Sequence, residues 1–139
     1  QDAFMAEPII LPWDKEEPYG HADGMVRYVG NNRVLLTNYS NFDIALRQRL
    51  LQALQPHFEV LELHYDVARP HKWNWAYINY LLVGGSLFVP CLHSDEDEQA
   101  SIQLGDALGI LHQHIELIDI NTILRAGGGL NCISWTILK

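Results

Sequence analysis

One order of predicted elements occurs twice in the sequence, and it constrains the fold more than any other feature. It consists of two short strands joined by a tight turn, followed by a helix and a third strand. In the first copy, strands are predicted at 25–29, where apolar and polar residues alternate, and at 33–37 and 58–63, and the helix is predicted at 43–55. Gly30-Asn31-Asn32 has the composition of a hairpin turn between the first two strands.

The second copy follows after a polar loop. Its strands are predicted at 75–83, 86–89 and 115–120, and Gly84-Gly85 supplies the tight turn between the first two. The helix is predicted at 95–111, and its acidic first turn suits the helix dipole and is expected to face solvent. The element order is therefore the same in both copies.

The two copies lie about fifty residues apart, a spacing typical of repeat architectures. The alternative is that a common unit recurs by chance. Residues 130–138 have the pattern of the first strand of a third unit. We therefore predict an α/β fold with about two and a half ββαβ modules in a single domain over residues 1–139. Because two and a half modules do not close a ring, we expect the domain to be part of a larger structure.

Composition excludes several classes of function. The formal net charge of −8 argues against nucleic acids and anionic membrane surfaces as partners, and it favours cationic ones. No apolar run reaches the length of a membrane span. Cys91 and Cys132 are expected to be reduced in a cytoplasmic protein, with Cys91 buried and inert. His112 and His114 lack a third ligand and no nucleotide-binding loop is present, so neither a metal nor a cofactor is predicted.

A glycine-rich turn leads directly into the second cysteine. Gly127-Gly128-Gly129 precedes Leu130, Asn131 and Cys132. Glycine lets backbone adopt a positive φ or come close to a bound group, so a cysteine beside this turn is a candidate nucleophile. The alternative is a tight turn before a buried cysteine, since cysteine is among the most buried residue types.

Three other polar residues fall at corresponding places in the repeat. His21 and Asp23 lie in the turn that enters the first predicted strand, and Asn79 lies within the first strand of the second unit. If the units pack around a common axis, these residues and Cys132 meet in one pocket. A histidine moves protons near neutral pH, and a carboxylate orients it or binds a cation. The alternatives are a turn-stabilising His21–Asp23 pair and a satisfied core amide at Asn79.

The same residues carry a resemblance to a known family. In order and spacing, the chain resembles the C-terminal half of the guanidine-modifying enzymes, in the branch of bacterial-type peptidylarginine deiminases and agmatine deiminases. The resemblance covers almost the whole chain and rests on these segments: Gly20-His21-Ala22-Asp23, Arg27-Tyr28, Tyr77-Ile78-Asn79-Tyr80, Pro90, and Gly127-Gly128-Gly129-Leu130-Asn131-Cys132-Ile133-Ser134.

The resemblance implies an α/β-propeller of five ββαβ modules around a central site. It implies hydrolysis of a guanidino group to a ureido product and ammonia through a covalent amidino-cysteine, without a cofactor. Cys132 would be the nucleophile, His21 the proton shuttle and Asp23 a guanidinium-binding carboxylate. Four residues would contact the substrate: Asp23, Asn79, Gly128 and Gly129. Arg27 of the motif is expected to be a structural ion-pair partner.

The chain departs from the family pattern at two places. Asn131 stands where the family usually has histidine, and the second guanidinium-binding carboxylate, which follows a Trp-x-Arg-Asp type segment, is absent. Agmatine (in putrescine biosynthesis), arginine derivatives and peptidyl-arginine all remain possible substrates. The expected partner is the missing N-terminal half or a second copy of the chain. A non-catalytic interaction module and, less favoured, an amidinotransferase are the alternatives.

Overall fold

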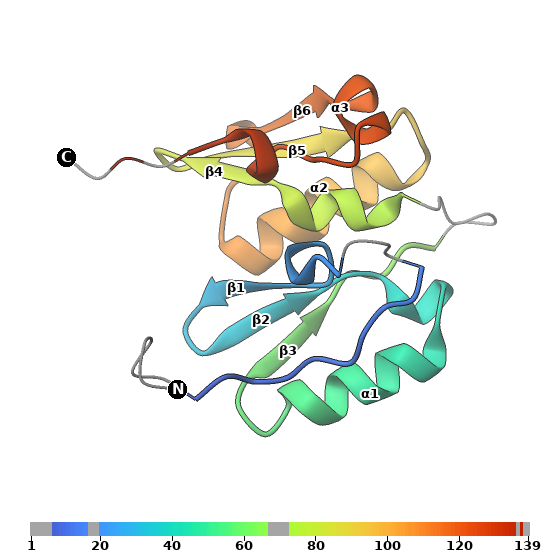
Figure 1. Ribbon diagram of the computed structural model, residues 1–139. Helices are drawn as coiled ribbons and strands as arrows, with labels where there is room; N and C mark the ends of the chain where they lie inside the picture. The colour runs from blue at the N-terminus through green and yellow to red at the C-terminus, as the bar shows by residue number, and fades with distance from the viewer. Residues whose placement is uncertain (1–6, 17–19, 67–72, 136, 138–139) are drawn as a thin grey trace.

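The computed structural model describes residues 7–16, 20–66, 73–135 and 137 of the chain. It contains two three-stranded sheets, each accompanied by a helix (Figure 1). The larger helices and all six strands occur within the two predicted units, so the α/β fold class is confirmed. No helix among these residues is long and apolar enough to cross a membrane.

The first module has the predicted ββαβ order. β1 pairs antiparallel with β2, and β2 pairs parallel with β3, which is reached through the helix α1. The hairpin turn contains Asn31 and Asn32 at φ values of 51° and 58°, the left-handed region that this type of turn requires. The bounds are β1 Val26–Gly30, β2 Arg33–Leu36, α1 Ile44–Leu54 and β3 Glu59–Glu62.

The second module repeats this topology. β4 pairs antiparallel with β5, β5 pairs parallel with β6, and the helix α2 connects the parallel strands. Gly109 ends α2 at a φ of 68°, a left-handed C-terminal cap that glycine adopts without strain. The bounds are β4 Leu81–Val83, β5 Ser86–Cys91, α2 Glu96–Leu108 and β6 Ile115–Asp119. The predicted repeat is therefore confirmed as two ββαβ modules.

Two predicted strands are wrong in part. Most of the strand expected at 75–83 is the 3₁₀ helix η3 (Asn74–Asn79), and only its end forms β4. Ala76, Tyr77 and Ile78 are consecutive and fully buried, and a continuous apolar run does not distinguish a strand from a buried helical segment. The strand expected at 130–138 is also absent: the chain forms η5 (Asn131–Ile133), and neither sheet includes any described residue that follows it.

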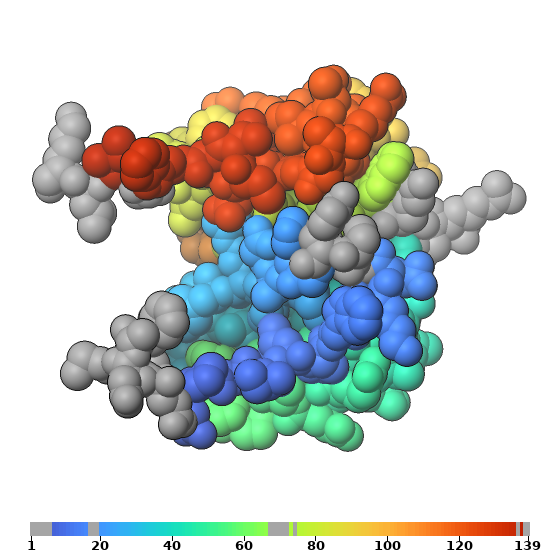
Figure 2. Space-filling model, in the orientation of Figure 1, coloured from blue at the N-terminus to red at the C-terminus, as the bar shows by residue number. Residues whose placement is uncertain are grey.

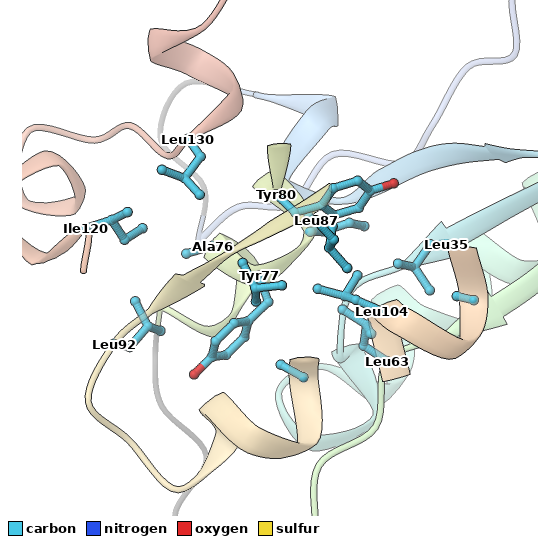
Figure 3. Packing of buried hydrophobic residues seen from close by; sticks show 14 of the residues in the cluster. Leu35, Leu63, Ala76, Tyr77, Tyr80, Leu87, Leu92, Leu104, Ile120 and Leu130 are labelled. Atoms are coloured by element: carbon cyan, nitrogen blue, oxygen red, sulfur yellow. The ribbon is translucent and has the colours of Figure 1, made fainter. Parts of the chain in front are cut away.

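The two modules share a hydrophobic core. Leu35 and Leu63 of the first module belong to the same buried cluster as Leu87 and Leu104 of the second. In Figure 3 the side chains of Leu35 and Leu63 are directed toward Leu104 of α2. A smaller cluster fills the space between α1 and its own sheet, and the N-terminal segment packs on it through Leu11. The modules are thus held together by apolar burial.

The acidic start of α2 is buried, contrary to the solvated turn that we predicted. Glu96 and Asp97 are only 2% and 8% exposed. Asp97 accepts hydrogen bonds from the Tyr77 hydroxyl at 2.7 Å, the Leu92 amide at 2.9 Å and the Ser94 amide at 3.2 Å. A carboxylate with this many donors is stable out of water. Burial, followed by the bond to Asp97, raises the pKa of the Tyr77 hydroxyl far above its ordinary value.

The helix α3 (Asn121–Arg125) was not predicted. It begins two residues after β6 ends, where the Asp119 side chain accepts from the Asn121 amide at 2.9 Å. Farther along the chain, the described residues after η5 extend away from the body of the molecule at the surface (Figure 2). Trp135 and Ile137 in this segment are 89% and 74% exposed.

Candidate functional site

Three short 3₁₀ helices carry the predicted site residues. Asp23 lies in η1 (Ala22–Gly24), Asn79 ends η3, and Cys132 is the middle residue of η5. η1 and η3 directly precede β1 and β4, so they are equivalent entry turns of the two modules. Gly24 faces Trp75, whose ring lies 3.5 Å from the position that a Cβ would occupy, so η1 packs closely on η3.

The Asn79 side chain connects the other two residues. Its Nδ2 donates to Oδ2 of Asp23 at 3.1 Å, and its Oδ1 accepts from the Asn131 amide at 2.9 Å. The thiol of Cys132 points at the same Oδ1, with Sγ at 3.6 Å. Asn79 is 1% exposed, so this amide is both a satisfied core group and the link between Asp23 and Cys132.

Cys132 and Asp23 face each other at the protein surface. Sγ of Cys132 lies 4.0 Å from Oδ2 of Asp23, and both side chains are exposed. His21 precedes η1 by one residue and is exposed as well; its carbonyl oxygen accepts from the Gly24 amide at 3.2 Å. The structure therefore brings Asp23, Asn79 and Cys132 into contact, and places His21 in the same turn as Asp23.

The glycine-rich turn is required by this packing. A Cβ on Gly129 would lie 2.5 Å from Oδ1 of Asn79 and 2.8 Å from its Cγ, closer than side chains approach. Gly128 has more room, since its nearest neighbours would be Ile123 at 3.4 Å and Cys132 at 3.7 Å. Gly127 has a φ of 85°. The bare backbone lets the turn lie directly on Asn79, which fixes the position of Cys132.

Arg27 on β1 links η3 to the segment that carries Cys132. Its guanidinium donates to the carbonyl oxygens of Ile78 at 3.2 Å and Tyr80 at 2.5 Å, and approaches Oδ1 of Asn131 at 3.5 Å. Its Cζ lies 3.9 Å from the centroid of the Tyr80 ring, a cation–π arrangement. The partners we find are carbonyl groups and a ring, whereas the sequence suggested an ion pair. The sequence identified Asn131 only as a departure from the family pattern. In the structure it belongs to this junction, because its side-chain oxygen lies beside the Arg27 guanidinium and its amide donates to Asn79.

Tyr80 shows how closed this junction is. Burial raises the pKa of its hydroxyl, and the Arg27 guanidinium partly opposes that shift.

Elsewhere, His112 and His114 lie exposed in η4 (His112–His114). Among the described residues, no group of three or more histidine, cysteine, aspartate and glutamate side chains is arranged to hold a metal ion.

Comparisons with known proteins identify the family of the chain and similar folds. The family model for Porphyromonas-type peptidyl-arginine deiminase matches residues 9–137. The fold resembles the agmatine deiminase of C. jejuni, with 22% identity and a TM-score of 0.63, over 81% of this chain and 37% of that one. It also resembles the agmatine deiminase of Enterococcus faecalis, with 14% identity and a TM-score of 0.65, over 82% of this chain and 39% of that one. A comparison with curated protein sequences found no match. The chain thus spans somewhat over a third of the length of these solved relatives.

Proposed function

The chain belongs to the Porphyromonas-type peptidyl-arginine deiminase family, and we propose that it supplies the nucleophile, one carboxylate and the proton shuttle of a site that hydrolyses a guanidino group. The products are a ureido compound and ammonia. Three residues carry the proposal: Cys132 as nucleophile, Asp23 as cation-binding group and His21 as acid and base.

The arrangement of Asp23, Asn79 and Cys132 is the observation that supports the proposal most directly. The carboxylate and the thiol lie 4.0 Å apart on the surface, and both contact one buried amide. A planar guanidinium that binds the Asp23 carboxylate through charge-assisted hydrogen bonds has its central carbon near Sγ. The bound cation also favours the thiolate, which is the reactive form of cysteine.

The proposed reaction proceeds in two balanced steps. The thiol proton moves to His21, and the thiolate adds to the guanidinium carbon. The C–N bond then breaks, His21 returns the proton to the departing ammonia, and an amidino-thioether on Cys132 remains. In the second step His21 takes a proton from water as the oxygen adds to the same carbon, and the C–S bond breaks. The ureido product leaves and the thiol is restored.

The remaining walls of the pocket come from protein outside these 139 residues. Asp23 and Cys132 are exposed here, and the chain covers only 37% and 39% of the two agmatine deiminases. The N-terminal half of a complete domain, or else a second copy, would then provide the other carboxylate that binds the guanidinium. The same surface would recognise the rest of the substrate, be it agmatine, an arginine derivative or a peptidyl-arginine.

Labelling with chloroacetamidine, whose amidinium resembles the substrate cation, tests the proposal. We expect labelling of Cys132 to saturate with reagent concentration and to be slowed by agmatine or by an arginine ester. Trypsin cleavage after Lys72 and Arg125 places the two cysteines in separate peptides, 73–125 and 126–139, so mass spectrometry assigns the label. Asp23→Asn should weaken the protection. Labelling of Cys132 no faster than that of a small free thiol would refute the proposal for this chain.

Product analysis separates the reaction classes. Ureido product without amidino transfer to added glycine supports hydrolysis, whereas transfer identifies an amidinotransferase. We expect Cys132→Ser to abolish turnover and Asp23→Asn to lower kcat/KM by about 10²- to 10³-fold, as for the loss of a charged group that stabilises the transition state. A protein that is labelled but releases neither product with any of the three substrate classes would be the non-catalytic alternative.

A further inference from the structure

A second cluster of reactive side chains lies at the ends of the parallel strands of the second module. Cys91 is the last residue of β5, Asp119 is the last residue of β6, and the two are register partners. His93 follows two residues after Cys91 at a φ of 56°, in the left-handed region that a residue with a Cβ rarely adopts. The carboxyl ends of parallel strands are where α/β proteins bind ligands. The cluster shares no residue with the Cys132 site.

The three side chains form an ordered chain of contacts. Sγ of Cys91 lies 3.7 Å from Nδ1 of His93, and Nε2 of His93 lies 3.1 Å from Oδ2 of Asp119. The other oxygen of Asp119 accepts from the backbone amide and the side-chain amide of Asn121, each at 2.9 Å. A carboxylate at Nε2 keeps the proton of the neutral ring there, so Nδ1 is left as an acceptor facing the thiol.

Carboxylates lie beside the Cys91 thiol. Burial raises the pKa of Cys91, the backbone amide of His93 opposes this shift, and the Asp97 and Asp119 carboxylates add to the effect of burial. Oδ2 of Asp97 lies 3.3 Å from Sγ and is a second acceptor, while the same carboxylate accepts from the Leu92 and Ser94 amides. A thiol beside two carboxylates needs a base to remove its proton during attack, and the His93 ring, with Nδ1 3.7 Å from Sγ, is in position to accept it.

We propose that Cys91, His93 and Asp119 form a thiol-modification site for a small cationic disulfide. The thiolate of Cys91 attacks one sulfur of the disulfide as its proton moves to Nδ1 of His93. The S–S bond of the reagent breaks, a new S–S bond forms to Cys91, and the leaving thiolate takes the proton from His93. Atoms and electrons balance without another oxidant.

Charge and accessibility select the class of reagent. Cys91, which the sequence predicted to be buried, is partly exposed, and the side chains of His93 and Asp119 are 66% and 59% exposed, so a small molecule reaches the cluster from solvent. Asp97 and Asp119 both lie beside the thiol, and the chain carries a formal net charge of −8. These charges attract a cation and repel an anion, an effect that salt screens.

Three disulfides of similar length test the selection by charge: cystamine, bis(2-hydroxyethyl) disulfide and dithiodipropionate. The Cys132→Ser protein leaves Cys91 as the cysteine that reacts, and the added mass is located in the tryptic peptide 73–125. Each rate is divided by the rate of the same reagent with the urea-unfolded protein. At low salt we expect cystamine to react about tenfold faster than dithiodipropionate, with the ratio falling in 0.5 M salt. Equal normalised rates for the two reagents overturn the proposal.

Substitution of His93 tests the proposed base. His93→Asn keeps a residue type that tolerates a positive φ but removes the ring, and we expect a rate with cystamine at least about tenfold lower at pH 7. His112→Asn in η4 is the matched control and should react like the parent. Asp119→Asn should also slow the reaction, by less. An unchanged rate in the His93 variant, in a protein that unfolds at the parent's temperature, overturns the proposal.

The pH profile separates this role from a structural one. The titratable groups that face Cys91 are His93 from the loop, Asp97 from α2 and Asp119 from β6, with Tyr77 bonded to Asp97. Base assistance matters only while the thiol is protonated, so the parent and the His93→Asn protein should converge in rate as the pH rises through the range where the thiol ionises. A constant ratio at all pH values would mean that His93 acts only through the fold, and the proposal would fail.

Discussion

The two ββαβ modules have the same topology but hold their helices in different ways. α1 begins at an exposed carboxylate, Asp43, whose side chain accepts from the Leu46 amide at 2.8 Å. α2 begins with two buried acids, and Asp97 there accepts from Tyr77, Leu92 and Ser94. A repeated backbone thus tolerates either a solvated cap or a buried polar network at the same position.

The ends of the third strands differ in a related way. Glu62 at the end of β3 receives two hydrogen bonds from Arg47 of α1, at 2.5 and 2.7 Å. Asp119 at the end of β6 is bonded to His93 and Asn121. The first module uses its strand-end acid to fasten its own helix, whereas the second uses it to orient a histidine beside a cysteine. The cluster of Cys91, His93 and Asp119 therefore has no counterpart at the strand-end acid of the first module.

The largest expected effect comes from removing the buried acid. Asp97→Ala leaves the Tyr77 hydroxyl and the Leu92 and Ser94 amides without their shared acceptor. We expect the free energy of unfolding to fall by about 3 kcal/mol or more, because each unsatisfied buried donor costs about 1–3 kcal/mol. Asp43→Ala removes one exposed cap and should cost about 1 kcal/mol.

Urea unfolding of the two variants measures this difference. The unfolding midpoint of Asp97→Ala should lie well below that of Asp43→Ala, with far-UV and near-UV probes giving coincident transitions in the latter. Asp97→Asn should recover part of the loss, since its side-chain oxygen still accepts from a backbone amide. Equal losses in the two alanine variants would show that the helix starts are held alike, and the contrast drawn between the modules would be wrong.

The glycine-rich turn before Cys132 offers a second test, of how the site residues are held together. Gly129→Ala places a methyl group 2.5 Å from Oδ1 of Asn79, so Asn79 or the turn must move. We expect a loss of about 1–3 kcal/mol, as for overpacking, together with slower labelling of Cys132 by chloroacetamidine. Gly128→Ala is the matched control for stability, because its nearest contact, Ile123 at 3.4 Å, is tolerable. If both variants label at the parent rate, the position of Cys132 does not depend on Asn79.

Much of the fold follows from local sequence. The turn at Asn31 and Asn32 and the alternation in the strand before it predicted the first hairpin correctly, because these signals depend only on neighbouring residues. The 3₁₀ helix η3 was mistaken for a strand because Ala76 to Asn79 are all buried, and a continuous buried run does not distinguish a strand from a helical segment. The burial of Glu96 and Asp97 was missed because their partners come from elsewhere in the chain, η3 among them.

The candidate site was predictable as a set of residues but not as a geometry. The repeat and the glycine-rich turn pointed to Asp23, Asn79 and Cys132, and the structure brings these together. Asp23 was expected in a turn and is found in one, whereas Asn79 and Cys132 were expected on first strands and lie in 3₁₀ helices. Arg27 contacts residues far along the chain, in η3 and beside Cys132, and sequence spacing gave no sign of those partners. Long-range hydrogen bonds of this kind depend on packing between modules.

A smaller effect is expected at the strand end of the first module. Arg47→Gln removes the paired bonds to Glu62, whose side chain is 25% exposed. We expect the free energy of unfolding to fall by about 1 kcal/mol, at the upper end for ion pairs near the surface, and the loss to shrink in high salt. A double-mutant cycle with Glu62→Gln isolates the pair from other effects of each substitution. A coupling energy indistinguishable from zero would mean that β3 and α1 are held by apolar packing alone.

The smallest effect, and the one that contrasts the two strand-end acids most finely, is the pH dependence at Asp119. Hydrogen bonds from the Asn121 amide and from His93 lower the pKa of Asp119 from 3.8 to about 2. A carboxyl whose pKa is lower in the folded state stabilises the fold above its unfolded pKa, and this contribution disappears as the pH falls through the folded value. The difference in unfolding free energy between the parent and Asp119→Asn should therefore shrink as the pH falls from about 4 to about 2. Because the carboxylate is exposed, high salt should reduce the difference. A difference that stays constant down to pH 2 would show that folding does not lower the pKa of Asp119. The hydrogen bonds from Asn121 and His93 would then not stabilise its carboxylate.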